Sequence, residues 1–407
     1  MNSHMKNIRK SSSRVRDTPW PMWPVFGDEE LEAVQRVIRS NQLFAAEEVA
    51  QFEKDFAAYI GTAYARGVGN ATEGLHLALA ALDIGVGDEV IVTPYSWISS
   101  ASCVLMQNAV PVFCDCERTS LGLCPDAVAK AVTERTKAII VVHMFGYPCN
   151  LSALRAIAKE NGLFLIEDAS HAPGALECGR KVGGIGDIGV FSLHQRKNLA
   201  VGDGGMVVTD NGEIDNRIYR LRSFGDRELS YNYRMTEFAG AIGQVRLRRL
   251  DFENQARIRN AKHMAELLGD VPGIKVRQPV EGTVSVYYRL LLDYELGMHK
   301  LPLSEFVLRL NAEGIPFSTT WVPLHRHPHF NPINNPARGC PWNWSMYTGG
   351  QLNRGRYRDL RFPLIEDFCD NRIVELPVHP TVGREEIHQA AESINKVIAG
   401  IGGSGRS

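Results

Sequence analysis

The spacing of apolar residues changes along the chain and predicts its elements. Over residues 28–38 and 49–59 apolar side chains recur every three or four positions, which predicts two amphipathic helices. Gly61 is a stop signal for the second helix. A short strand starting at Tyr64 then ends in a small polar turn, and a helix carrying Leu75, Leu79 and Leu82 follows.

Short apolar runs then alternate with helical segments. The runs that predict strands are residues 89–93, 110–113, 138–142, 163–166, 189–192 and 206–209. Helices are predicted between the early runs, at residues 98–107, 125–132 and 151–161. Strands alternating with helices indicate right-handed crossovers, so we expect an α/β fold with a mostly parallel sheet covered on both faces.

The C-terminal third has a different pattern. A helix of residues 236–268 carries an apolar stripe and is expected to bridge two domains, followed by a strand at 284–294 and helices at 303–313 and 384–399. We therefore predict three parts, namely a partly disordered arm (1–25), a large domain (26–255) and a small α/β domain (256–407). Residues 331–363 contain few helical cues and are predicted to form a long irregular insertion. Loops of this length without secondary structure are uncommon unless they have a function.

Composition excludes several classes of protein. The net charge is −1, from 45 basic and 46 acidic residues, so no field of one sign can attract nucleic acid or an anionic membrane. The apolar runs fall far short of the ~18–20 residues that span a bilayer, and the N-terminus lacks the apolar core of a signal peptide. The eight cysteines show no CxxC pair, and Cys114 and Cys116 lack further metal ligands nearby. We expect no metal, reduced thiols and a cytoplasmic location.

The strand ends carry the candidate chemistry. Ligands of parallel sheets bind beyond the carboxyl ends of the strands, and these ends offer Trp97, His143, Asp168, His171, Ser192 and Lys197. Lys197 lies between two predicted strands, in FSLHQRKN before the turn GDGG. Desolvation in a pocket would lower the lysine pKa and make the amine a nucleophile or base. A solvated surface lysine is the alternative that this pattern alone leaves open.

Two further positions have both a structural and a functional interpretation. Asn70, Ala71 and Thr72 precede a helix, where free N–H groups and the helix dipole can bind a phosphate. Thr72 is equally a good N-cap residue. Asp168 ends a buried strand, where a carboxylate is costly unless paired, and capping of the next turn would suffice to explain it.

Taken together, these residues match the needs of pyridoxal 5'-phosphate (PLP). That cofactor requires a Schiff-base lysine, an acid facing its ring nitrogen, a stacking aromatic ring and a phosphate cup. Lys197, Asp168 and Trp97 would meet the first three needs, and Asn70–Thr72 with Ser192 the fourth. The first strand is not followed by G-x-G-x-x-G, which argues against a dinucleotide-binding protein.

The chain resembles the DegT/DnrJ/EryC1/StrS family of PLP-dependent sugar and cyclitol aminotransferases, which have the aspartate-aminotransferase-like fold (fold type I). The resemblance runs from about residue 26 to the end of the chain. It is carried by GVGNATEGLHLALAALDIGVGDEVIV, VVHMFGYPCN, IEDASHAPGA, FSLHQRKN, GDGGMVVT, YNYRMTEFAGAIGQVRL, PLHRHPHF and LPVHP. It implies a large domain with a mostly parallel sheet of the seven-stranded type and a smaller C-terminal domain.

The resemblance implies a role for each matched residue. Lys197 would form the Schiff base and carry the proton, Asp168 would keep the ring nitrogen protonated, and Trp97 would stack on the ring. The phosphate would be bound by Ala71, Thr72 and Ser192. Asn232 would reach the phosphate of the neighbouring subunit, which implies a homodimer with shared sites.

Two more residues are matched with alternatives left open. Arg234 would support the Asn232 loop or the site, and a structural ion pair explains it equally well. His325, in PLHRHPHF, resembles a substrate-contacting position, although a surface loop is the alternative.

Three positions depart from the family pattern. His171 stands where members usually have Gln near the ring hydroxyl, Pro173 where they have His, and Asp203 where Glu is commoner. His171 can still donate a hydrogen bond, but it is titratable. Lys197 is retained, whereas the related deoxysugar dehydratases have His there, so the resemblance implies transamination.

The implied reaction is a ping-pong transfer from L-glutamate or L-glutamine to a keto-sugar, keto-sugar nucleotide or keto-cyclitol, in aminosugar, antibiotic or glycan biosynthesis. A PLP-dependent dehydratase or eliminase and a non-catalytic PLP-binding regulatory protein are the alternatives. We further hypothesise that residues 331–363 shape the acceptor pocket. The arginines of residues 326–361 could bind a diphosphate or lie solvated on the surface.

Overall fold

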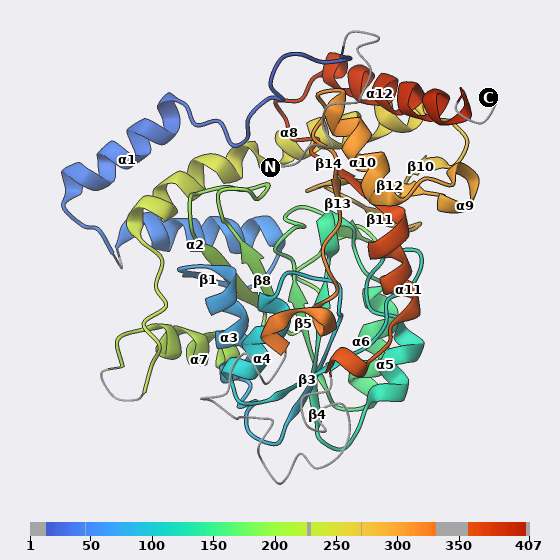
Figure 1. Ribbon diagram of the computed structural model, residues 1–407. Helices are drawn as coiled ribbons and strands as arrows, with labels where there is room; N and C mark the ends of the chain where they lie inside the picture. Colours follow the sequence, from blue (N-terminus) through green and yellow to red (C-terminus); the bar gives the residue numbers. More distant parts are fainter. Residues whose placement is uncertain (1–13, 45, 226–228, 270, 331–356, 404–407) are drawn as a thin grey trace.

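A seven-stranded sheet forms the centre of the molecule (Figure 1). The computed structural model describes residues 14–44, 46–225, 229–269, 271–330 and 357–403. The strand order is β1-β9-β8-β5-β4-β2-β3. The strands are β1 (Tyr64–Val68), β2 (Glu89–Val92), β3 (Val110–Phe113), β4 (Thr136–Val142), β5 (Phe164–Asp168), β8 (Ile188–Ser192) and β9 (Gly205–Thr209). Only β9 pairs antiparallel within this sheet, with β8 and β1, which confirms the predicted mostly parallel α/β fold.

Helices cover both faces of this sheet. The helices α5 (Pro125–Ala131) and α6 (Leu151–Glu160) lie together on one side, and α3 (Ala71–Ala81), α4 (Ser99–Met106) and α7 (Gly212–Arg222) on the other (Figure 1). Strands β2, β3 and β8 are buried along their whole length, because both of their faces are covered. Their continuous apolar runs are the reason that sequence alone located them.

Three further helices pack together beside the sheet. Helices α1 (Asp28–Ser40) and α2 (Glu47–Ile60) pack on α8 (Glu237–Leu267). Helix α2 ends at Gly61, which has a φ of 91° as the predicted stop requires. The buried Glu237 carboxylate accepts hydrogen bonds from the backbone N–H groups of Ala46, Glu48 and Val49, and so fixes the start of α8 against that of α2.

The C-terminal part forms a second, antiparallel sheet. Its order is β10-β12-β14-β13, from β10 (Ile274–Val276), β12 (Leu290–Tyr294), β14 (Ile373–Leu376) and β13 (Ser318–Thr319). The accompanying helices are α9 (Leu296–His299), α10 (Leu303–Ala312), α11 (Pro363–Asp367) and α12 (Arg384–Gly403). The expected domain boundary at residues 255–256 falls inside the unbroken α8, and one continuous hydrophobic core joins side chains of both sheets.

The predicted strand at residues 284–294 is two strands. Its first residue belongs to β11 (Thr283–Val284), which pairs with β6 (Leu176–Glu177) in a small sheet completed by β7 (Arg180–Lys181). The chain then leaves the extended conformation, with Tyr287 at a φ of 45°, before β12 begins at Leu290. Uniform apolar character cannot reveal that the two ends of this run have different partners. The single-strand prediction was therefore wrong.

The described part of the N-terminal arm is anchored at two points. Arg16 is buried, and its guanidinium contacts Glu386 and Gln389 of α12. The Trp23 indole donates a hydrogen bond to the backbone carbonyl of Lys197. Residues 1–13, and most of the predicted insertion (331–356), lie outside the described residues. Within the described ranges, no helix is both long enough and apolar enough to cross a membrane.

Candidate active site

A cavity of about 780 Å³ opens beyond the carboxyl ends of β5 and β8. Its wall includes eight of the residues predicted from the sequence, namely Asn70, Ala71, Thr72, Trp97, Asp168, His171, Ser192 and Lys197. These residues are spread over more than 120 positions of the chain, and the parallel sheet brings them to one edge.

A tightly bonded turn presents the Lys197 side chain to the cavity. The Lys197 N–H donates to the His194 carbonyl at 2.8 Å, and the Lys197 carbonyl accepts from the Trp23 indole at 3.0 Å. The glycine-rich turn that follows lets β9 pass close to the site, because a Cβ on Gly205 would lie 2.6 Å from the carbonyl carbon of Asn70. The backbone of Lys197 is thereby fixed while its amine remains in the cavity.

The surroundings of the amine make it reactive. The pKa of Lys197 is lowered to about 8, mainly by burial; the charge of Asp168 opposes this lowering, and the charge of Arg289 adds to it. The amine nitrogen lies 4.9 Å from the ring centroid of Tyr288. A large fraction of the side chain is therefore the neutral amine near pH 8, the form that attacks a carbonyl.

Asp168 is a buried acceptor held by two hydrogen bonds. It ends β5 and is 4% exposed. One carboxylate oxygen accepts from the Ser100 hydroxyl at 2.6 Å, and the other from the Ser170 N–H at 3.2 Å. The second bond is the turn-capping contact considered from the sequence. The Ser100 bond extends through a further 2.6 Å contact to Ser96, which lines the cavity, so capping is only part of the Asp168 environment.

The start of α3 offers free donors. Asn70, and not Thr72, is the N-cap residue, because the Asn70 side-chain oxygen accepts the Glu73 N–H at 3.0 Å. Thr72 is the second residue of the helix, and its hydroxyl is 2.6 Å from that of Ser99. The first N–H groups of a helix have no acceptor within it. Ala71 and Thr72 thus bring two such groups to the cavity wall, where an anion can accept from them.

His171 belongs to an aromatic wall. Its ring is stacked on Tyr288, with 4.3 Å between centroids, and meets Trp321 edge-on. The Nδ1 atom accepts the Phe145 N–H at 3.2 Å, so the proton is on Nε2. Burial, followed by the charges of Lys197 and Arg289, holds the pKa of His171 well below its usual range. The ring is a neutral donor whose Nε2 has no hydrogen-bond partner among the described residues.

Several cavity residues were not found from the sequence. They come from the C-terminal part, and they are Tyr288, Arg289, Ser318, Thr319, Trp321 and Glu375. Tyr288 and Arg289 reach the site because the chain turns between β11 and β12. In the part of the chain that the structure describes, Arg289 forms no ion pair, so its guanidinium is available to an anionic ligand. A polar residue within the apolar run VYYRLLL was the available signal.

His143 does not join the other strand-end residues. Its fully buried ring contacts the Glu167 carboxylate at 3.0 Å through Nε2 and accepts the Cys149 N–H at 3.1 Å through Nδ1. Glu167 also accepts from Gly183, Ile185 and Gly186. The expectation that His143 faces the site was wrong, because its side chain is needed beneath the sheet end to satisfy a buried carboxylate.

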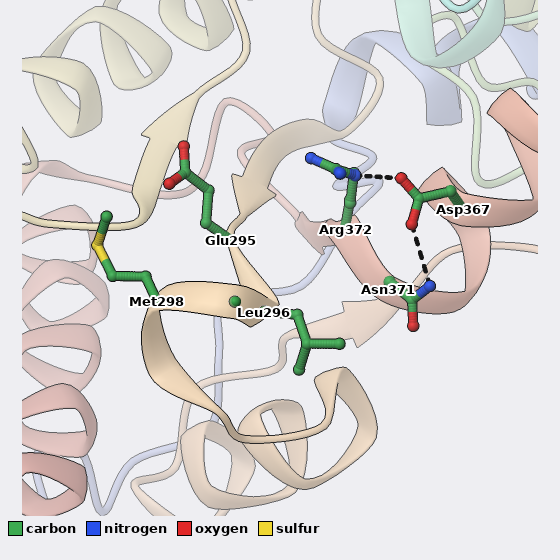
Figure 2. Close-up of a pocket in the computed structure, with 7 residues that line it drawn as sticks. Glu295, Leu296, Met298, Asp367, Asn371 and Arg372 are labelled. Atoms are coloured by element: carbon green, nitrogen blue, oxygen red, sulfur yellow. Dashed lines mark hydrogen bonds and ion pairs between the residues drawn. The ribbon is translucent and has the colours of Figure 1, made fainter.

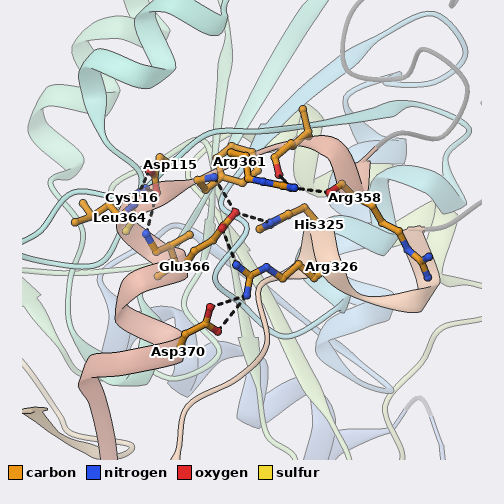
Figure 3. Close-up of polar contacts among 12 residues, drawn as sticks. Asp115, Cys116, His325, Arg326, Arg358, Arg361, Leu364, Glu366 and Asp370 are labelled. Atoms are coloured by element: carbon orange, nitrogen blue, oxygen red, sulfur yellow. Dashed lines mark hydrogen bonds and ion pairs between the residues drawn. The ribbon is translucent and has the colours of Figure 1, made fainter. Parts of the chain in front are cut away.

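His325 also lies outside the cavity wall. Its buried Nε2 is 3.0 Å from Glu366, which also pairs with Arg326, and Arg326 pairs in turn with Asp370 (Figure 3). Arg361 donates to backbone carbonyl oxygens. The surface-loop alternative for His325 was therefore wrong, because its side chain is buried. Arg326 and Arg361 have partners within the chain, three other arginines of residues 326–361 lie outside the described residues, and a diphosphate contact by this group stays a prediction. A substrate contact by His325 stays a prediction.

Neither Asn232 nor Arg234 lines the cavity of its own chain, although Tyr233 between them does. Asn232 is exposed, with a φ of 61°, and its side-chain oxygen accepts from Arg234 at 3.0 Å. The Arg234 guanidinium lies 3.5 Å from the ring centroid of Phe224 and 4.9 Å from that of Phe44. Arg234 thus supports the loop of Asn232 through stacking and a hydrogen bond.

A second pocket, of about 570 Å³, lies beside α9 (Figure 2). Asp367 pairs there with Arg372 and accepts from Asn371 at 3.1 Å, while Glu295 and Met298 complete the wall. None of the residues predicted for the site lines it. The chemistry is therefore concentrated in the larger cavity.

Comparisons with known proteins identify the family of this chain. A sequence model of the DegT/DnrJ/EryC1/StrS aminotransferase family matches residues 24–395. The chain is 34% identical to the L-glutamine:2-deoxy-scyllo-inosose aminotransferase of Streptoalloteichus tenebrarius, covering 94% of this chain and 95% of that protein. It is 36% identical to the L-glutamine:scyllo-inosose aminotransferase of Streptomyces griseus, covering 80% and 82%.

The fold is also found among solved structures. The structure of the aminotransferase from Psychrobacter cryohalolentis superposes with a TM-score of 0.86 at 29% identity, covering 94% of this chain and 100% of that one. The structural neighbours are PLP-dependent aminotransferases of fold type I, as the resemblance implied. This chain belongs to the DegT/DnrJ/EryC1/StrS aminotransferase family.

Proposed function

We propose that the protein is a PLP-dependent aminotransferase that moves an amino group from L-glutamine or L-glutamate to a ketone of a sugar, sugar nucleotide or cyclitol. The observation that carries this proposal is the Lys197 amine, with a pKa of about 8, in one cavity with the buried Asp168. Relatives named for L-glutamine and inosose ketones support the donor and the acceptor class.

The cavity residues fit PLP. The neutral His171 brings an unpartnered Nε2–H donor to the wall, which suits the ring hydroxyl of the cofactor. The N–H groups and hydroxyls of Ala71, Thr72 and Ser192 suit its phosphate, and Trp97, 59% exposed, offers a ring face. PLP, when bound, supplies an electron sink for the amino-acid α-carbon.

Three residues perform the chemistry that the protein itself contributes. Lys197 would hold the cofactor through its amine and, once released, would move a proton at its Nζ atom. Asp168, fixed by Ser100, would hold a proton on the ring nitrogen of the cofactor. Arg289, which lacks a described ion-pair partner, binds the α-carboxylate of the donor, since a guanidinium matches a carboxylate in a bidentate way.

The proposed active unit is a homodimer. Asn232 lies on the surface of its own chain, so its predicted contact with the cofactor phosphate requires a second subunit. Exposed apolar side chains on α1, α8 and the loops around them support such an interface; they are Leu31, Ile38, Leu43, Phe44, Phe224 and Phe252. We also propose a cytoplasmic location, because the cysteines of the described residues are unpaired. The proposed domain division lies within α8 and separates the seven-stranded sheet from the four-stranded sheet.

An absorption spectrum of the PLP-loaded protein tests the function. L-glutamine or L-glutamate should convert the visible cofactor band to the shorter-wavelength band of the aminated cofactor, and a keto-cyclitol or keto-sugar should restore it. Lys197→Ala should lose both changes, whereas Lys159→Ala, at the exposed end of α6, should keep them. A band that neither donor alters would favour elimination chemistry, and absence of any band would refute the site.

A further inference from the structure

One carboxylate of the cavity wall has an unused oxygen. Glu375 lies in β14, is 3% exposed and lines the cavity. Its Oε1 atom is buried and has no hydrogen-bond partner among the described residues. Burying a carboxylate oxygen without a hydrogen-bond donor costs free energy, so we expect a bound ligand to supply the donor.

The neighbours of Glu375 do not supply that partner. Its cross-strand neighbours are Leu291 and Ser318, and the nearby Arg289 forms no ion pair with it within the described residues. Burial raises the pKa of Glu375 to about 7, and the Thr320 hydroxyl and Arg289 only partly oppose this rise. Arg289 and Glu375 line the cavity from neighbouring strands, because Arg289 directly precedes β12 and Leu291 of β12 pairs with Glu375. Glu375 would therefore lie close to a ligand whose charged end Arg289 holds.

We propose that Glu375 is a specificity-determining residue that accepts a hydrogen bond from an uncharged O–H or N–H group of the substrate. Two substrates of the proposed reaction carry such a group: the keto acceptor carries hydroxyl groups, and glutamine carries a side-chain amide. The inference therefore rests on the proposed function. A second carboxylate, such as that of the glutamate side chain, would be repelled by the ionised Glu375.

Separate half-reactions of the PLP-loaded enzyme test this role. The variants are Glu375→Gln, which removes the charge and keeps one acceptor oxygen, and Glu375→Met, which removes both. Glu177→Gln is the matched control, because Glu177 is buried and bonded to Ser152 but does not line the cavity. Stopped-flow spectra give the rate and half-saturation concentration for glutamine and glutamate, and then for a keto-cyclitol and its analogue lacking one hydroxyl.

The two sources of the hydrogen bond give different results. If the amide is the source, the preference for glutamine over glutamate falls ~10–100-fold in both variants, as expected for one hydrogen bond to a charged group, and the acceptor half-reaction is unchanged. If a hydroxyl is the source, the half-saturation concentration for the acceptor rises by that factor in Glu375→Met, partly recovers in Glu375→Gln, and the variants no longer distinguish the deoxy analogue.

Two results would overturn the inference. One is a set of preferences that stays within twofold of wild type in both variants. The other is an equal loss of rate with every substrate, accompanied by a lowered unfolding temperature, which indicates a structural role. Failure of the proposed function is distinguishable, because the wild-type cofactor band would then respond to neither donor.

Discussion

Replacing Glu167 by glutamine tests how much the hydrogen bonds of this buried carboxylate stabilise the protein. The two residues Glu167 and Asp168 are adjacent in β5, so their side chains point to opposite faces. Glu167 is fully buried and accepts four hydrogen bonds, from the N–H groups of Gly183 (2.6 Å), Ile185 (2.7 Å) and Gly186 (2.5 Å) and from the His143 ring (3.0 Å).

The geometry determines the size of the effect. Glutamine has one acceptor oxygen, which can keep the bonds of Ile185 and Gly186 at the Oε1 position. Its NH₂ group then opposes the N–H of Gly183 and the Nε2–H of His143. The ring cannot change its tautomer cheaply, because Nδ1 accepts the Cys149 N–H. Losing two bonds to a charged acceptor, at ~1.5–3 kcal/mol each, predicts a loss of about 3–6 kcal/mol.

Urea unfolding of the PLP-loaded protein at pH 7.5 measures this loss. Glu160→Gln, at the exposed end of α6, is the control and should change stability by less than about 0.5 kcal/mol. Burial raises the pKa of Glu167, but His143 and the backbone N–H groups outweigh it and hold this pKa below its ordinary value. The contribution is therefore present above the unfolded-state pKa and lost as pH falls through the lower folded-state pKa. A loss below about 1 kcal/mol at pH 7.5 would refute the reasoning.

Three further predictions concern the reactive end of the site. Amine labelling of Lys197 in the cofactor-free protein, followed by mass spectrometry, should rise with pH around a midpoint of about 8, and removing Arg289 should move that midpoint upward. An unshifted midpoint near 10.5 would contradict the burial argument. Trp23→Phe removes the indole donor to the Lys197 carbonyl and should lower the free energy of unfolding by about 1 kcal/mol in urea titrations, while an unchanged value would show that this bond contributes nothing. Ser100→Ala removes the 2.6 Å bond to Asp168 and should slow the donor half-reaction ~10–100-fold in stopped-flow spectra; a rate within twofold of wild type would argue against it.

Sequence reasoning located the elements and residues whose signals are local. The run at residues 110–113 matches β3, because both faces of that strand are buried and every residue must be compatible with the core. Asp168 ends such a run, and Lys197 lies a few residues after another. The sheet topology brings both residues to the same cavity.

The missed residues depend on contacts that are distant in sequence. Arg289 enters the site because Tyr287 takes a positive φ in what reads as one strand. Glu375 faces the cavity because of the register of β14 with its neighbours, which no spacing in the sequence specifies. His143 was wrongly placed in the site because the side chain of a residue after a strand can point either into the site or beneath the sheet. The buried Glu167 carboxylate, which His143 contacts, holds the ring beneath the sheet.

The arm before α1 binds both the C-terminal helix and the backbone beside the candidate site. Arg16 is bound to α12, and Trp23, seven residues later, donates to the backbone carbonyl of Lys197. These few residues therefore join the C-terminal helix to the turn that carries Lys197. Removing the residues before position 24, a natural choice because the family match begins there, would delete both contacts and keep every predicted site residue. We therefore expect the segment needed for a stable site to begin before the family match does.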